Sequence, residues 1–380
     1  MRRFTRMLSA VTSGLLLVGV GATAVSAQGA PSLLPPGATV EARLLNNPRQ
    51  LSLVGESNTL LIAEAGSGGK KCISDPEFGT TCIGNTGAIR SLALDGHSHT
   101  VRLATGFLSS ASPDGSFAVG SDGVSARHLN QIFIQETFFP PGPIATLPGS
   151  RTDGRLLRLD TGHPPFNFAN ITAFETANDP DHQGFDSDPY AVLSLYKRTI
   201  VADAAGNDLL SVDPTGKVSL LTVLPNISDA ACAGQPNDNG TTGCDAVPTS
   251  LAVGPNGHLY VGQLAGEGGG AGRISEIDLA TGAIVKNYTG FTTVTGVAVA
   301  PDGTIYASQL FGGDPSAPVP GLVTKIATNG TRTSVKVPFP AGLALDRTGR
   351  LYVSVFSGSP AGGLGIPGVD TSGQVWRMRI

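Results

Sequence analysis

The sequence predicts an all-β protein folded as a six-bladed β-propeller, and three observations lead to this fold class. A short unit recurs along the chain, and four copies, which begin at Leu51, Leu251, Val297 and Leu343, match almost residue for residue. Each copy has the pattern of a β-hairpin, with alternating apolar residues on both sides of a tight turn such as Pro-Asn-Gly or Pro-Asp-Gly. The 51 glycines and 27 prolines are typical of turn-rich β-structure. Such a repeat indicates a fold assembled by copying one small sheet.

The repeat also sets the domain organisation. A chain of 380 residues could hold two domains. Because the repeat runs through the chain, we expect one propeller domain over residues 28–380. Its six sheets, or blades, should each contain four antiparallel strands ordered from the axis outward.

The expected strands follow the hairpin pattern, and blade two is the least regular. Whether blade two has four proper strands stays open. The strands, blade by blade, are residues 50–54, 60–65, 87–94 and 100–104; 117–119, 131–136, 154–160 and a weak strand near 169–174; 190–195, 199–204, 208–212 and 217–224; 250–253, 259–263, 273–278 and 283–289; 296–300, 304–309, 322–327 and 333–337; and 342–346, 351–356 and 374–380.

Blade six lacks an outer strand at the C-terminal end of the chain. Residues 39–45 have no partner in blade one, and there Val40, Ala42 and Leu44 alternate with polar residues. We therefore expect this segment to close the ring as the fourth strand of blade six. Such a closure removes an exposed sheet edge.

The N-terminus has the pattern of a secretory signal peptide. Arginines at positions 2, 3 and 6 precede an apolar stretch, and small residues end it at Ala27. Residues 1–27 are thus expected to be removed on export. A membrane anchor is the alternative, although the stretch is short and rich in Gly, Ala, Ser and Thr. No later segment is long and apolar enough to span a bilayer.

Four cysteines form two close pairs, Cys72 with Cys82 and Cys232 with Cys244, in polar, Gly-rich loops. In an exported protein these spacings predict two local disulfides. A zinc site is the alternative, but neither spacing is that of a CxxC motif and no nearby His completes a ligand set. The net charge of −4 makes nucleic acid an unexpected partner, and the chain has no basic patch for a membrane surface.

The loops separate two faces of the predicted ring. Turns between first and second strands, and between third and fourth strands, are short and lie on what we call the plain face. Five long links lie on the opposite, loop-rich face: residues 66–86, 137–153, 175–188, 226–247 and 357–372. Loops on one end of a rigid scaffold are where binding surfaces usually lie. Phe138 and Phe139, in the second link, are expected contacts for a protein or small-molecule ligand.

The whole chain after residue 27 resembles the exported ScyD/ScyE family, and residues 201–216 resemble NHL-type propeller repeats. The matching features are Asn47-Pro48-Arg49, residues 63–66 before a Cys-bearing loop, and residues 84–89, 203–207 and 247–254. The resemblance implies a propeller fold and export. It brings no established catalytic residues to this chain.

Polar side chains recur at the ends of the second strands: Glu64, Glu136, Asp203, Gln263 and Gln309. Related six-bladed lactonases hold a divalent metal near this axial mouth, where carboxylate and amide oxygens suit a hard cation such as Ca²⁺. Asn207 is a further ligand-binding candidate. Alternatively, these side chains bind backbone N–H groups at the strand ends, or water in the channel.

The acidic loop before blade three is a second candidate for calcium. Asp179, Asp181, Asp186 and Asp188 place oxygens at alternating positions and partly resemble an EF-hand loop, but Tyr190 stands where that motif has its final Glu. A solvated loop that leads into the next strand is the alternative. No other cofactor is expected.

Three functional hypotheses follow. The favoured one is an exported binding or scaffolding module that uses the loop-rich face and contains no assembled catalytic constellation. The second is a metal-assisted hydrolase or lactonase whose axial mouth uses Glu64, Asp203, Gln263 and Gln309. The third is a purely structural envelope protein.

Overall fold

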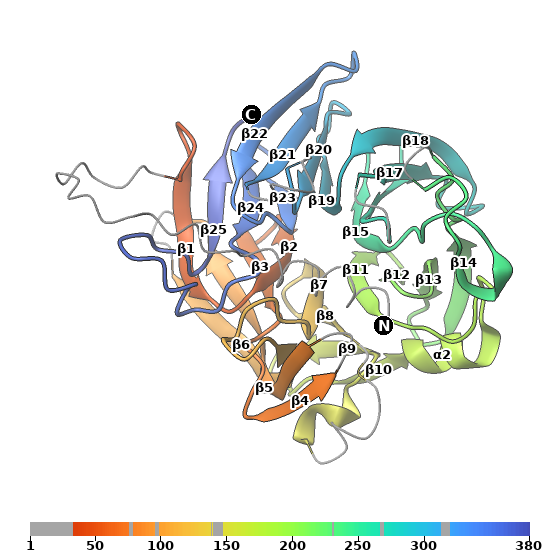
Figure 1. The fold of residues 1–380 in the computed structure, drawn as a ribbon. Helices are drawn as coiled ribbons and strands as arrows, with labels where there is room; N and C mark the ends of the chain where they lie inside the picture. The colour runs from red at the N-terminus through yellow and green to blue at the C-terminus, as the bar shows by residue number, and fades with distance from the viewer. Residues whose placement is uncertain are drawn as a thin grey trace, which may run out of the picture.

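The computed structural model describes residues 33–75, 79–95, 99–137, 139, 147–229, 232–266, 270–312 and 320–380. Six antiparallel sheets surround a central axis, so the predicted six-bladed β-propeller is confirmed (Figure 1). The expected signal peptide and Phe138 lie outside the described residues. None of the helices in these ranges has the length and hydropathy of a membrane-spanning segment.

The first three blades follow the chain in order. Blade one contains β2 (Pro48–Val54), β3 (Thr59–Glu64), β5 (Gly79–Ala93) and β6 (Thr100–Ala111), and β4 (Lys71–Asp75) pairs with the first part of β5. Blade two contains β7 (Ser121–His128), β8 (Gln131–Glu136), β9 (Arg155–Asp160) and β10 (Phe166–Asn170), with the 3-10 helix η1 (Pro148–Arg151) between β8 and β9 and the helix α2 (Ile171–Asn178) after β10. Blade three contains β11 (Pro189–Leu195), β12 (Arg198–Asp203), β13 (Asp208–Val212) and β14 (Val218–Val223).

The last three blades are similar, and the 3-10 helix η2 (Asp238–Gly240) precedes them. Blade four contains β15 (Pro248–Val253), β16 (Leu259–Gln263), β17 (Gly272–Ile277) and β18 (Ile284–Phe291). Blade five contains β19 (Val294–Val299), β20 (Ile305–Gln309), β21 (Gly321–Ile326) and β22 (Arg332–Val337). Blade six contains β23 (Leu343–Leu345), β24 (Leu351–Val355), β25 (Gly373–Met378) and β1 (Thr39–Leu45).

The core lies between neighbouring blades. The second strand of a blade is buried on both faces because a blade packs on each side of it, so every residue of β16, β20 and β24 is buried. One core cluster joins Leu61 of blade one to Val124 and Ile134 of blade two. Each such side chain stabilises the fold by about 1.5–3 kcal/mol through burial.

The predicted ring closure is confirmed. Strand β1 pairs with β25 in antiparallel register, with Val40 opposite Trp376 and Ala42 opposite Val375. Arg377 Nε lies 2.9 Å from Glu41 Oε1 across this seam. Residues from opposite ends of the chain therefore complete one sheet.

The first strand expected in blade two is wrong. Residues 117–119 form only an isolated bridge between Val119 and Ser110, and the inner strand is β7, Ser121–His128. Phe117 has a φ of 50°, outside the extended region. The apolar alternation did not predict β7 because this strand contains a charged residue, Asp122, at a fully buried position.

The weak outer strand expected near residues 169–174 is only partly correct. Strand β10 ends at Asn170, and α2 begins directly after it. The side-chain oxygen of Asn170 accepts a hydrogen bond of 3.1 Å from the backbone N–H of Ala173. This is the usual N-cap interaction, which satisfies an N–H group that the first turn of a helix leaves unpaired.

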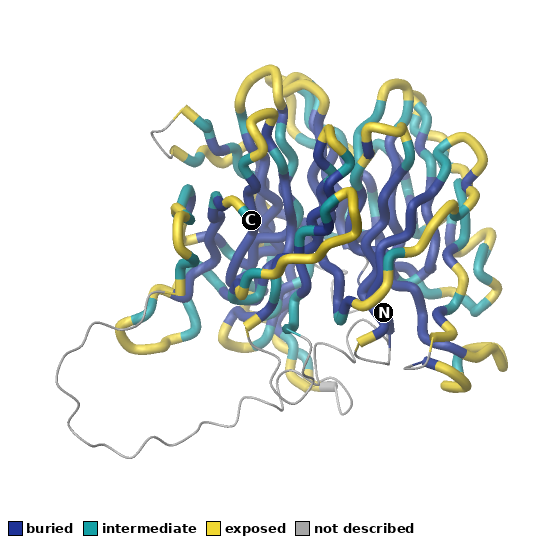
Figure 2. Tube along the Cα trace, turned by 90° about the horizontal axis from the view of Figure 1, so that it is seen from above, coloured by how far each residue is buried: buried dark blue, intermediate teal, exposed yellow. Residues whose placement is uncertain are grey.

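The two ends of the ring differ as expected (Figure 2). Tight turns close the hairpins on the plain face; in one of them Gly303 N donates to Ala300 O over 2.9 Å. The long links lie at the other end. Both predicted disulfides are present in these links, Cys72–Cys82 between β4 and β5 and Cys232–Cys244 between β14 and β15.

Candidate functional site

The side chains predicted at the axial mouth occupy equivalent positions in five blades. Each is the last residue of a second strand and lies opposite the first residue of the inner strand. Glu64 lies opposite Pro48, and Asp203 lies opposite Pro189. Glu136, Gln263 and Gln309 have the same place in blades two, four and five. The ladder is irregular directly after each of these pairs.

The two carboxylates Glu64 and Asp203 are engaged within the scaffold. Glu64 Oε1 accepts a hydrogen bond of 2.8 Å from Asn46 N, and its Oε2 lies 2.5 Å from Arg90 Nε. Asp203 Oδ1 accepts from the backbone N–H of Asp188 over 2.6 Å. These bonds fix the links that lead into the inner strands.

The amides in this set have similar roles. Gln309 accepts from Thr292 N over 2.9 Å, and Gln263 donates to Ser275 over 2.6 Å. Asn207 accepts from Val247 N over 3.2 Å and also donates to Asp181 over 3.1 Å. Glu64, Asp203 and Gln309 thus accept hydrogen bonds from backbone N–H groups at the strand ends, as the alternative to an axial metal site predicts.

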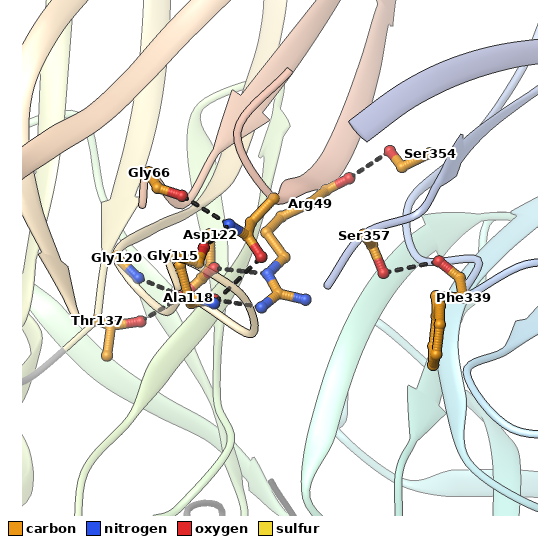
Figure 3. Close-up of polar contacts among 11 residues, drawn as sticks. Arg49, Gly66, Gly115, Ala118, Gly120, Asp122, Thr137, Phe339, Ser354 and Ser357 are labelled. Atoms are coloured by element: carbon orange, nitrogen blue, oxygen red, sulfur yellow. Dashed lines mark hydrogen bonds and ion pairs between the residues drawn. The ribbon is translucent and has the colours of Figure 1, made fainter. Parts of the chain in front are cut away.

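Arg49 and Asp122 form an ion pair that sequence analysis missed (Figure 3). Arg49 Nε lies 3.3 Å from Asp122 Oδ1, and the guanidinium also donates to the carbonyl of Ala118. Asp122 Oδ2 accepts from Thr137 Oγ1 over 2.6 Å and from Gly120 N over 3.0 Å. Burial raises the pKa of Asp122, while Arg49 and these hydrogen bonds oppose the shift.

The same pair connects three blades. The backbone of Arg49 belongs to blade one, and its guanidinium contacts Asp122 of blade two. Its carbonyl oxygen accepts a hydrogen bond of 2.7 Å from the hydroxyl of Ser354 in blade six. Arg49 is 7% exposed and Asp122 is fully buried. Arg49 belongs to the Asn-Pro-Arg segment noted in the sequence, which was the one available signal for it. Asp122 lay in a segment that was not expected to be a strand.

Three further carboxyls around this pair have raised pKa values. Burial, with the nearby charge of Asp122, raises the pKa of Asp188 to about 7. Burial raises the pKa of Asp153 to about 7, although Phe139 N donates to it over 2.6 Å. Burial also raises the pKa of Glu136 well above its ordinary value. Carboxyls that keep a proton near neutral pH can act as general acids where a substrate reaches them.

The side chain of Gln50, the residue after Arg49, connects blade one to blade three at the axial channel. Gln50 of β2 donates to Val192 O over 2.6 Å and accepts from Val192 N over 3.1 Å, and Val192 belongs to β11 of blade three. On the plain face the channel opens into a cavity of about 480 Å³ lined by all six inner strands. Gln50 is one of the residues that line this cavity.

The predicted acidic loop is partly assembled. Asp179 and Asp181 lie with Glu175, a residue of α2 that was not a candidate, so that one oxygen of each lies within 4.8 Å of the others. Asp186 and Asp188 are not part of this group. Phe139 is 2% exposed and packs with Ile83 and Leu108, so in this structure it is a core residue and not a surface contact.

No family model and no curated protein sequence matches the chain. Among solved structures, a gluconolactonase from Xanthomonas campestris is similar with a TM-score of 0.51 and 10% identity over 90% of this chain and 88% of that chain. A calcium-binding protein, regucalcin, from Agrobacterium tumefaciens is similar with a TM-score of 0.51 and 14% identity over 90% and 93%. At such identities the likeness supports the class, a six-bladed β-propeller, and no particular activity.

Proposed function

We propose that this chain is an exported recognition protein of the ScyD/ScyE type, which binds its partner through the loop-rich face. The N-terminal signal pattern and the two disulfides support export, since disulfides persist in oxidising compartments. The family assignment rests on the sequence features given above. The binding role rests on how the loops are held.

The observation that carries this proposal is a set of hydrogen bonds between loops of different blades. The side chain of Asn47 donates to Gly66 O over 2.8 Å and to Gly115 O over 2.9 Å, which joins the entry loops of blades one and two. The backbone N–H of Asn47 donates to Ser359 O over 2.8 Å, which adds the long link of blade six. Loops fixed in this way form a preorganised surface, which lowers the entropic cost of binding.

Two large apolar side chains are exposed on this face. Phe185, in the link before β11, is 50% exposed, and Ile366, in the link between β24 and β25, is also 50% exposed. The plain face offers a matched pair, Tyr196 at 71% and Val253 at 38%. These residues allow the two faces to be tested separately without changing the core.

The test uses the chain from residue 28 onward, immobilised and exposed to the soluble extracellular fraction of the native cells. Retained proteins and polysaccharides are measured for the parent and for two double variants. F185S with I366S should lose the retained partner, whereas Y196S with V253S should keep it. Loss in the plain-face variant alone, or equal retention by both variants, would show that the loop-rich face is not the binding surface.

A second candidate function is a hydrolase that acts at the Arg49–Asp122 level. It is favoured by the raised pKa of Asp188, on which the charge of Asp122 acts, and one similar structure is a gluconolactonase. Asp122 and Asp188 are at most 2% exposed, so a substrate reaches them only if the loops above move. Lactone hydrolysis above the background rate that is lost in D188N would favour this candidate over recognition alone.

A further inference from the structure

The loop-rich face carries a cluster of carboxylates apart from the axial level. Glu175 lies near the end of α2, and Asp179 ends that helix with a φ of 40°, in the left-handed region. This turn brings Asp181 back toward the helix, so that one oxygen from each of the three side chains lies within 4.8 Å of the others. Three carboxylates from one short segment thus face a common point.

One carboxylate of the cluster, Glu175, and the neighbouring carboxylate of Asp208 are buried without any hydrogen-bond donor. Glu175 and Asp208 are both fully buried, and none of their four oxygens has a hydrogen-bond partner among the described residues. Asp208 begins β13, opposite Asp203. A buried carboxylate with no donor is costly, so such groups are normally paired, protonated or bound to a metal.

The backbone of the β12–β13 turn lies against this cluster. A Cβ atom added at Gly206 would lie 3.2 Å from Glu175 Oε2 and 3.4 Å from Asp203 Cγ. The absence of a side chain at Gly206 therefore lets the turn approach the two carboxylates closely. The site is built by α2, the acidic loop and this turn together.

The charges that act on the cluster have one sign. Burial is the largest cause of the raised pKa of Glu175, which is about 8. The neighbouring negative charges of Asp203, Asp181 and Asp179 raise it further. Asp203, Glu175 and Asp181 act on Asp208 in the same direction. No Lys or Arg is among these principal charges. Such an arrangement of negative charge favours the binding of a cation.

We propose that Glu175, Asp179 and Asp181 bind one calcium ion, with Asp208 as the buried charge behind it. Calcium takes six to eight oxygen ligands in flexible geometry, so carbonyl oxygens or water would complete the shell. Asp179 and Asp181 keep lone pairs for a metal: Gly184 N donates to Asp179 over 3.1 Å, and Gln183 N donates to Asp181 over 3.0 Å. The proposal is independent of the binding role proposed above.

The bound ion would also fix the loop that contains the second disulfide. Gln183 donates to Asn226 over 3.1 Å, and Asn239 donates to the carbonyl of His182 over 2.8 Å. Asn226 precedes the Cys232–Cys244 loop, and Asn239 lies within it. Calcium at the cluster would therefore order two links of the loop-rich face at once.

The experiment titrates the disulfide-intact chain with CaCl₂ after removal of metals with EGTA, using calorimetry and thermal unfolding, with MgCl₂ as the comparison. We expect one calcium per chain with a dissociation constant at or below about 1 mM, as extracellular calcium modules have, and weaker binding of magnesium. The melting temperature should rise with calcium. If calcium up to about 10 mM produced neither a heat of binding nor a change in melting temperature, the proposal would be overturned, because this concentration is well above the expected dissociation constant.

Two variants and a control assign the site. E175Q and D181N should each weaken calcium binding at least about tenfold, because each removes a charged ligand. E175Q should also raise the melting temperature of the calcium-free protein, because it relieves repulsion among the carboxylates. E56Q, on the plain face, where Glu56 is 69% exposed, should bind calcium like the parent. Parent-like affinity in both E175Q and D181N would place the ion elsewhere and refute the assignment.

Discussion

The guanidinium of Arg49 lies 3.3 Å from the carboxylate of Asp122, and the two side chains connect blades one and two beside the axis. This pair differs from the predicted ligand candidates, such as Glu64 and Glu136, which lie at the ends of the second strands. The pair has consequences for stability that are separate from any bound ligand.

Replacing Arg49 with Met should destabilise the fold by about 3–5 kcal/mol, because it leaves Asp122 buried without its partner. Arg43 and Asp370 provide the control, since this ion pair is 52% and 43% exposed. R43M should cost no more than about 1 kcal/mol, as solvent-exposed pairs do. Urea denaturation of both variants measures the difference. Equal small losses would show that the Arg49 pair contributes little.

Stability of the calcium-free protein should fall as the pH rises from about 4 to about 7. Burial holds the pKa of Asp153 and Asp188 at about 7, whereas an exposed aspartate has a pKa near 4. In this window the folded chain keeps protons that the unfolded chain has released, so unfolding becomes more favourable with rising pH and levels off above the folded pKa. The expected loss is on the order of 2–4 kcal/mol.

This pH dependence is measured by urea denaturation at pH 5 and pH 8 in the presence of EGTA. D188N should flatten the profile, because it removes one group with a raised pKa. A stability that increases from pH 5 to pH 8, or an unchanged slope in D188N, contradicts the assignment of protonated buried carboxyls.

The seam between the chain ends should be essential for folding. Leu45 is fully buried at the end of β1, whereas its neighbour Leu44 is 62% exposed. L45A should destabilise the protein by about 2–5 kcal/mol, as truncation of a buried leucine does. L44A should change the free energy of unfolding by about 0.5 kcal/mol or less. Similar effects of the two changes would mean that β1 is not packed as described.

The two disulfides should differ in their contribution to stability. Cys232 and Cys244 are fully buried and pack against Ile227, whereas Cys72 is exposed. Replacing both residues of the second pair with Ser should cost about 2–4 kcal/mol. Replacing the first pair should cost less, although the loops it closes are of similar length. Thermal unfolding of the two double variants compares them, and a larger loss for the Cys72 pair would refute this ranking.

Most of the fold could be predicted from the sequence because each blade repeats one local pattern. Alternating apolar residues and tight turns placed the strands of blades three to five within a few residues of their observed bounds. The unpaired segment at residues 39–45 was enough to predict ring closure. Blade two was less predictable, since the carboxylate of Asp122 interrupts the apolar alternation of its inner strand.

The candidate sites were less accessible to sequence analysis. The strand-end residues Glu64 and Asp203 were found, but their hydrogen bonds to backbone N–H groups depend on loop conformations that no pattern encodes. The Arg49–Asp122 pair joins two blades and leaves no local signal. Glu175 was missed because its segment was expected to be strand and loop; Asn170, a strong N-cap residue, was the signal for a helix there.

The most direct test of the account is a map of the surface that binding protects. Amide hydrogen exchange is measured for the chain from residue 28 onward, alone and with the partner retained from the extracellular fraction. We expect added protection in residues 179–187 and 357–372 and none in the plain-face turns at residues 213–216, 301–303 and 328–330. Protection confined to those turns would contradict the claim that the loop-rich face recognises the partner.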